Sequence, residues 1–140
     1  MAAGDLRRPD RRQRAAIEAA VAEAESRTGL ELCVYLGALD DASPRDHAEA
    51  MFTGAGLHER PAVMIVVAPR QRRVEIVVGP AALHRISDDD AEAAVAGMVP
   101  YLRRRDLVGG LSSGLRRLAD AAGPGERPDG GEHLPDLIEE

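Results

Sequence analysis

The sequence contains no lysine and no tryptophan, and its only aromatic residues are Tyr35, Phe52 and Tyr101. The absence of lysine excludes Schiff-base chemistry and the phosphate-binding lysine of P-loop proteins. With so few aromatic residues the core must be aliphatic, and the stacking platforms that bind single-stranded nucleic acid are missing. The net charge of -6, from 24 acidic residues and 18 arginines, also argues against nucleic acid as the main partner.

The chain has a single cysteine, Cys33, which excludes an internal disulfide and a cysteine-based metal site. Because Cys33 lies in an apolar run, a buried, inert thiol is favoured over a reactive one. No apolar run approaches the roughly 18 residues of a membrane span, and no apolar segment follows the basic residues near Met1. These absences predict a cytoplasmic protein.

Two short apolar runs lie next to each other in the middle of the chain. Val63–Ala68 and Val74–Val78 are rich in Val and Ile, and the polar link Pro69–Arg73 separates them. Runs of this length and composition predict strands, and the short link predicts that they form a buried antiparallel β-hairpin. Leu30–Leu36 is largely apolar on both faces, which predicts an internal strand covered on two sides.

Four further segments show helical spacing of apolar residues and begin at capping residues. They are expected at about Asp10–Thr28, at Pro44–Phe52, from the cap Ser87 to a point near Arg103–Arg105, and at Leu107–Ala122. Pro100 is expected to kink or interrupt the third helix. Since a helix separates Leu30–Leu36 from Val63–Ala68, these two strands should be parallel with a right-handed crossover.

Together these segments predict an α/β fold with a small mixed sheet that contains a central β-hairpin. A chain of 140 residues predicts one domain, expected here at residues 10–122. Residues 1–9 are polar and are expected to form a flexible N-terminus. Residues 123–140 are rich in Gly, Pro and acids, and we expect them to form a disordered acidic tail.

Two pairs of aspartates are candidate ligands for Ca²⁺ or Mg²⁺, which prefer carboxylate oxygens. Asp40 and Asp41 follow the first strand, at the end of a parallel strand where α/β proteins place ligand sites. Asp88 and Asp89 follow Ser87 at a helix start, and the two loops would have to converge to form one site. The simpler interpretations are a solvated loop for the first pair and a capped helix start for the second.

Arginine clusters are the other candidates for binding. Arg70, Arg72 and Arg73 lie at the predicted hairpin tip, and they could bind acidic partners or phosphate. Arg103–Arg105 forms a further cluster near a helix end. His84, in the loop after the hairpin, could act beside the aspartates. Solvated surface is the simpler interpretation of each.

Taken in order, a series of motifs resembles the TPM domain family, over about residues 13–120. The motifs are Glu25–Gly29, His47–Phe52, Val66–Pro69, Arg73–Gly79, Ile86–Asp88 and Pro100–Leu118. The all-arginine variant is similar to small actinobacterial proteins of this kind that carry a domain-of-unknown-function name. The resemblance implies a three-layer α/β/α sandwich with helices on both sides of the mixed sheet.

The resemblance also bears on function. Members of this family are mostly extracytoplasmic or membrane-tethered, some assist the assembly or repair of membrane complexes, one plant branch is an acid phosphatase, and Ca²⁺ is associated with the fold. Here Arg60-Pro61-Ala62 replaces the family's Asp-Asn-Gly, and Gly79–His84 replaces a Gly-Tyr-Gly-x-Glu-Gly segment. Acidic and glycine positions that would build a metal or phosphate site are therefore lost.

From these departures we expect a non-catalytic module for protein interaction or assembly, with a protein partner and no cofactor. The alternative is a divalent-metal-dependent phosphatase that uses Ca²⁺ or Mg²⁺ at Asp40, Asp41, Asp88 and Asp89. No oligomeric state follows from the sequence.

Overall fold

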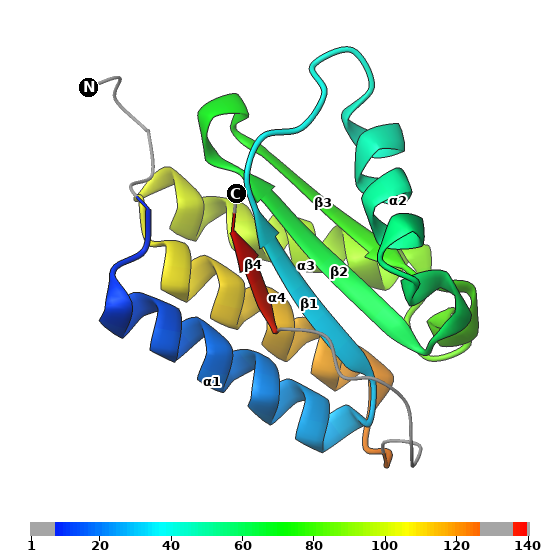
Figure 1. Cartoon of the computed structure of the whole chain (residues 1–140). Coiled ribbons are helices and arrows are strands. Elements are labelled where there is room, and N and C mark those ends of the chain that lie inside the picture. The colour runs from blue at the N-terminus through cyan, green and yellow to red at the C-terminus, as the bar shows by residue number, and fades with distance from the viewer. Residues whose placement is uncertain (1–7, 127–135, 140) are drawn as a thin grey trace.

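The computed structural model describes residues 8–126 and 136–139 (Figure 1). Its helices and strands follow in the order α1 (Arg11–Thr28), β1 (Glu31–Leu36), α2 (Pro44–Gly54), β2 (Ala62–Ala68), β3 (Arg73–Val78), α3 (Asp88–Arg103), α4 (Leu107–Ala122) and β4 (Leu137–Glu139). The predicted helices and strands are all present, with shifts of one or two residues at their ends. No described helix is long and apolar enough to cross a membrane.

The strands form one mixed sheet in the order β3-β2-β1-β4. β1 and β2 are parallel, and β2 and β3 are antiparallel, as the sequence predicts. Within the hairpin, β2 is internal and β3 lies at the edge of the sheet. The register pairs Leu36 with Val67 and Ala68 with Arg73, so the end of β1 lies beside the hairpin tip.

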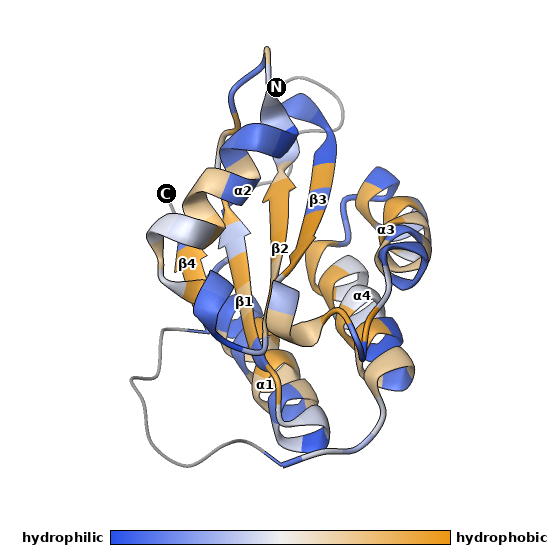
Figure 2. Cartoon of the chain, turned by 90° about the vertical axis from the view of Figure 1, so that its right-hand side faces the viewer, coloured by the Kyte–Doolittle hydropathy of each residue, from blue (hydrophilic) through white to orange (hydrophobic). Residues whose placement is uncertain are grey.

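Helices cover both faces of the sheet, which confirms the expected α/β fold. Figure 1 shows α1, α3 and α4 on one side and α2 on the other, and Figure 2 shows hydrophobic residues along the strands between them. All seven residues of β2 are buried. Alternate residues of β2 belong to two separate cores: Ile65 packs in the core on the α1, α3 and α4 side, and Met64 in the core on the α2 side.

Local hydrogen bonds define the ends of the helices. Asp10 and Gln13 form a capping box at the start of α1, and Gly29, with φ of 75°, ends that helix in the left-handed conformation. Ser87 and Asp90 form the corresponding box at α3. The carboxylate of Asp106 accepts a hydrogen bond from the Gly109 backbone N–H at the start of α4.

Of the two effects expected of Pro100, a kink or an interruption, the interruption is wrong, because the helix is continuous through Pro100 to Arg103. Proline removes one backbone hydrogen bond, but α3 packs closely along α4. At Gly114 of α4 an added Cβ would lie only 2.6 Å from the sulfur of Met98 on α3. This close packing supports the helix where its own hydrogen bonding is interrupted.

The expectation of a disordered tail is wrong for Leu137–Glu139, which pair in parallel with Val34–Leu36 of β1. The Glu139 carboxylate accepts a hydrogen bond from the Arg14 guanidinium at 3.1 Å. The local sequence does not reveal this strand, because three residues in an acidic segment carry almost no pattern. Of the expected flexible N-terminus and tail, residues 1–7, 127–135 and 140 lie outside the described residues.

The Cys33 thiol is buried in the core on the α2 side, as expected. Burial, with a smaller effect from the negative charge of Glu31, raises the pKa of this thiol from 9.0 to about 12. The thiolate is therefore scarce at neutral pH, which favours an unreactive thiol.

Arg85 connects the ends of two helices that lie far apart in the sequence. Its guanidinium donates hydrogen bonds to the carbonyl of Thr28 at 2.7 Å, at the end of α1, and to that of Gly123 at 2.8 Å, just after α4. A cation at the carboxyl end of a helix also opposes the negative end of the helix dipole. Arg85 therefore stabilises both helix ends at once.

We expect Arg85→Ala to lower the free energy of unfolding by about 2 kcal/mol, since it leaves partly buried carbonyls without a charged donor. Chemical denaturation of the purified protein measures this change. Arg116→Ala is the matched control, because Arg116 is exposed on α4 and makes none of these hydrogen bonds. Equal stability of the two variants would contradict the role given to Arg85.

We also expect Cys33 to stay unmodified by a thiol reagent at neutral pH in the folded protein, and to react fully in denaturant. The burial of Cys33 should also lower the free energy of unfolding as the pH rises from 9.0 to about 12. The unfolded thiol ionises above its ordinary pKa of 9.0, whereas the folded thiol stays protonated until about 12. Rapid modification under native conditions would show that the thiol is accessible.

Candidate functional site

The first pair of predicted metal ligands organises the loop after β1. Asp40 and Asp41 are exposed. The Asp40 carboxylate accepts hydrogen bonds from the backbone N–H groups of Ala42 and Ser43 at 2.8 and 3.1 Å. The Asp41 carboxylate accepts a hydrogen bond from the side-chain amide of Gln71 at the hairpin tip. Both aspartates therefore have structural partners within this loop and the neighbouring turn.

The second pair, Asp88 and Asp89, is exposed in the first turn of α3. The sheet topology explains why the loops after β1 and β3 do not converge. Because β3 is antiparallel to β2, it ends at Val78, which pairs with Val63 at the start of β2. Leu36, where β1 ends, lies at the opposite end of the strands, beside Val67. Among the described residues, no three His, Cys, Asp or Glu side chains gather where they could hold a metal ion. The donor groups present thus do not fit a Ca²⁺ or Mg²⁺ site.

Two other candidate residues, His84 and Arg70, are exposed in turns and do not line a site together. His84 is exposed in the turn between β3 and α3. Arg70 is exposed in the short 3₁₀ turn at Pro69–Gln71 and does not line the cleft described next. The remaining candidates, Arg72 and Arg73, do line it.

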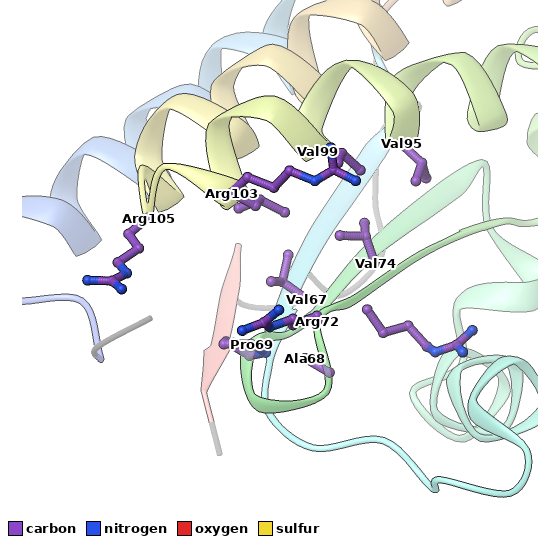
Figure 3. Close-up of a pocket in the computed structure, with 11 residues that line it drawn as sticks. Val67, Ala68, Pro69, Arg72, Val74, Val95, Val99, Arg103 and Arg105 are labelled. Carbon is purple, nitrogen blue, oxygen red and sulfur yellow. The ribbon is translucent and has the colours of Figure 1, made fainter. Parts of the chain in front are cut away.

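An open cleft of about 690 Å³ lies between the hairpin tip and the end of α3 (Figure 3). Four arginines line it, two from each side. Arg72 and Arg73 come from the hairpin tip, Arg103 comes from the end of α3, and Arg105 comes from the turn that follows it. We call this feature the arginine cleft. Sequence inspection treats these as two separate clusters, and the fold brings them together because α3 runs back toward the tip.

Apolar side chains complete the lining of the arginine cleft. They are Val67, Ala68, Pro69, Val74, Val95, Val99 and Leu102. In Figure 3, Val74 of β3 and Val95 of α3 come from facing walls, and Arg103 extends along α3 toward Val99. The site therefore combines a hydrophobic floor with a cationic rim.

The charges of the arginine cleft are only partly neutralised by the protein itself. No carboxylate is among its lining residues. Arg73 pairs with Glu75 at 3.3 Å. Within residues 8–126 and 136–139, no carboxylate forms an ion pair with Arg103 or Arg105. A guanidinium presents a planar set of N–H donors that matches a carboxylate or phosphate, so this rim is suited to an anion.

Two of these arginines have an unfavourable backbone conformation. Arg72 and Arg105 have φ of 53° and 62°, and they are the only non-glycine residues with positive φ in the described part of the chain. This conformation costs an L-residue about 1–2 kcal/mol. Each residue lies where a helical turn ends, Arg72 after the 3₁₀ turn and Arg105 after α3, and such ends often place a residue in the left-handed conformation. The two strained residues mark one rim position on each side of the cleft.

Comparison with known proteins identifies a matching family model and several similar structures. A family model described as the TPM domain matches residues 10–121. The BA42 protein from the psychrophilic bacterium Bizionia argentinensis has a similar NMR structure, with a TM-score of 0.79 and 20% identity over 94% of each chain. The N-terminal domain of a P. gingivalis protein has a TM-score of 0.70 and 19% identity, over 81% of this chain and 75% of that one.

A third similar structure is the N-terminal domain of the cg2496 protein from Corynebacterium glutamicum. It has a TM-score of 0.65 and 16% identity, over 91% of this chain and 85% of that one. At these identities the similarities show the fold alone. No curated protein sequence matches the chain.

We expect glycine at position 105 to give a more stable protein than alanine, by about 1 kcal/mol, because only glycine relieves the positive φ. Both variants remove the same guanidinium, so denaturation of Arg105→Gly and Arg105→Ala isolates the backbone effect. Arg104, with φ of -90°, is the control position. There alanine should be the more stable residue, and the same order at both positions would argue against strain at Arg105.

Proposed function

Because the chain belongs to the TPM domain family, we propose that it is an interaction domain of this family without catalytic activity, which binds an acidic segment of a partner protein in the arginine cleft. The observation that carries this proposal is that four arginines and seven apolar residues line one cleft, with no carboxylate in the lining. The cytoplasmic location and the protein nature of the partner stay predictions from the sequence.

The chemistry of the cleft indicates what the partner segment must contain. Exposed guanidinium–carboxylate pairs contribute only about 0.2–1 kcal/mol each, so charge alone does not give a stable complex. Apolar contact with the floor formed by Val67, Val74, Val95 and Val99 adds about 25 cal/mol per Å² of surface removed from water. The fitting ligand is therefore an acidic segment that also carries apolar side chains.

The same features weigh against a divalent-metal-dependent phosphatase as the function. Such an enzyme needs carboxylates that hold the metal near the phosphate. Asp40 and Asp41 bond within their own loop and to the hairpin tip, whereas Asp88 and Asp89 begin α3. The arginines could bind a phosphate group, but no nucleophile or base lies among the lining residues of the cleft.

Peptide binding tests the proposal directly. The probe is a peptide of about nine residues in which glutamate pairs alternate with leucine, and the readout is the dissociation constant from calorimetry. We expect the double variant Arg103→Glu/Arg105→Glu to weaken binding about tenfold or more, because both charges on one wall are reversed. Added salt should weaken binding to the unaltered protein.

Arg116→Glu and Arg117→Glu together form the matched control, since both residues are exposed on α4 and neither lines the cleft. This control carries the same change in net charge and should bind the peptide within about twofold of the unaltered protein. Equal weakening in the two double variants would show that only net charge matters, and the proposal would fail.

A phosphatase assay separates the two functions. With Ca²⁺ or Mg²⁺ and a chromogenic phosphomonoester, we expect no turnover above the buffer rate for either the unaltered protein or Asp88→Asn. The physical reason is that the described carboxylates do not gather around a metal position. Turnover that Asp88→Asn abolishes would overturn the assignment as a non-catalytic domain.

A further inference from the structure

We propose that the arginine cleft is one end of a longer groove between β3 and α3, and that the groove binds a partner segment with segregated charges in a fixed direction. The acidic end of the segment lies in the arginine cleft, and its basic end lies near Asp88 and Glu92. This inference rests on the proposed function and adds the charge pattern and direction of the ligand.

A second hollow, of about 500 Å³, continues the arginine cleft along the same two elements. Its lining residues are Arg45, Val74, Glu75, Ile76, Asp88, Ala91, Glu92 and Val95. Val74 and Val95 line both hollows, so the two meet at these side chains. Together they form one groove with β3 along one wall and α3 along the other.

The two ends of this groove differ in charge. Four arginines and no carboxylate line the first hollow, whereas Glu75, Asp88, Glu92 and Arg45 line the second. Glu75 is already paired, with Arg45 at 3.4 Å and with Arg73 at 3.3 Å. Asp88 and Glu92 are exposed and form no ion pair with another described residue. They therefore supply the available negative charge of the far end.

The helix dipole explains only one wall of this arrangement. Acids at the start of α3 and arginine at its end stabilise any helix. On the hairpin wall, Arg72 lies at the basic end, whereas the alternation of β3 turns Arg73 and Glu75 toward the α2 face, where Glu75 pairs with Arg45 and Arg73. The dipole of α3 does not account for Arg72, whose charge matches an acidic ligand end.

The dimensions of the groove indicate the size of the ligand. Asp88 and Arg103 are separated by about 22 Å along α3, at 1.5 Å per residue. An extended peptide of about seven residues spans this distance. The Arg45 guanidinium donates a hydrogen bond to the backbone carbonyl of Ile76 at 2.7 Å, which occupies the edge of β3 at that position. The segment therefore binds across side chains and does not extend the sheet there.

The test compares two peptides of about nine residues with the same leucine core. One has glutamates on both sides of the core, and the other has glutamates on one side and arginines on the other. We expect Glu92→Arg to strengthen binding of the all-acidic peptide and to weaken binding of the segregated peptide, each by about threefold or more. Because the two changes have opposite sign, a loss of folding does not produce this pattern.

Glu18→Arg on α1 is the matched control, because Glu18 is exposed and does not line either hollow. It should change the affinity for both peptides by less than about twofold. The direction in which the segregated peptide binds is determined separately by NMR. A spin label at the acidic end of the segregated peptide should broaden the amide signals of Val99 and Arg103 and leave those of Asp88 and Ala91 visible.

The outcomes distinguish the two proposals. If neither peptide binds the unaltered protein, the proposed function itself fails. If the all-acidic peptide binds but Glu92→Arg changes both affinities in the same direction, the arginine cleft stands and the charge-segregated groove is wrong. Vesicles of equal parts phosphatidylcholine and phosphatidylglycerol that bind more tightly than either peptide, and lose binding in Arg103→Glu, would overturn both in favour of a lipid surface.

Discussion

The structure depends on the burial of β2 on both faces. Every residue of this strand is buried, and alternate side chains enter two separate cores. Each buried aliphatic side chain stabilises the fold by about 1.5–3 kcal/mol, but only if helices cover both faces of the sheet. The three-layer arrangement of α2, the sheet and the group α1, α3 and α4 follows from this requirement. Hydrogen bonds at helix ends, such as those of Arg85, then secure elements that the cores bring together.

The same packing creates the candidate site. α3 must lie against the face formed by β2 and β3, and it runs from near Ile76 back toward the hairpin tip. Its final arginines consequently approach Arg72 and Arg73. The positive φ values of Arg72 and Arg105 show that the chain adopts costly conformations at this meeting point.

The placement of charge determines which function the fold supports. Solved structures of proteins from Bizionia argentinensis, P. gingivalis and Corynebacterium glutamicum share this fold. In this chain the aspartates at either end of the sheet bond locally or begin a helix, and the described residues hold no three-ligand metal group. Four arginines, in contrast, line one cleft together with apolar side chains. Recognition of an acidic segment therefore has more physical support here than metal-assisted hydrolysis.

The sequence by itself determines most of the fold, since its signals are local. Short apolar runs predict β1, β2 and β3, and the capping residues Asp10 and Ser87 predict helix starts, because each signal depends on residues a few positions apart. Arg72 and Arg73 were also identifiable as candidates from their place at a turn. Only the tertiary structure decides that β4 joins β1, that Pro100 lies within a continuous helix, and that Arg103 and Arg105 line the same cleft as the hairpin tip. These features depend on contacts between residues far apart in the chain, and no short-range pattern encodes such contacts.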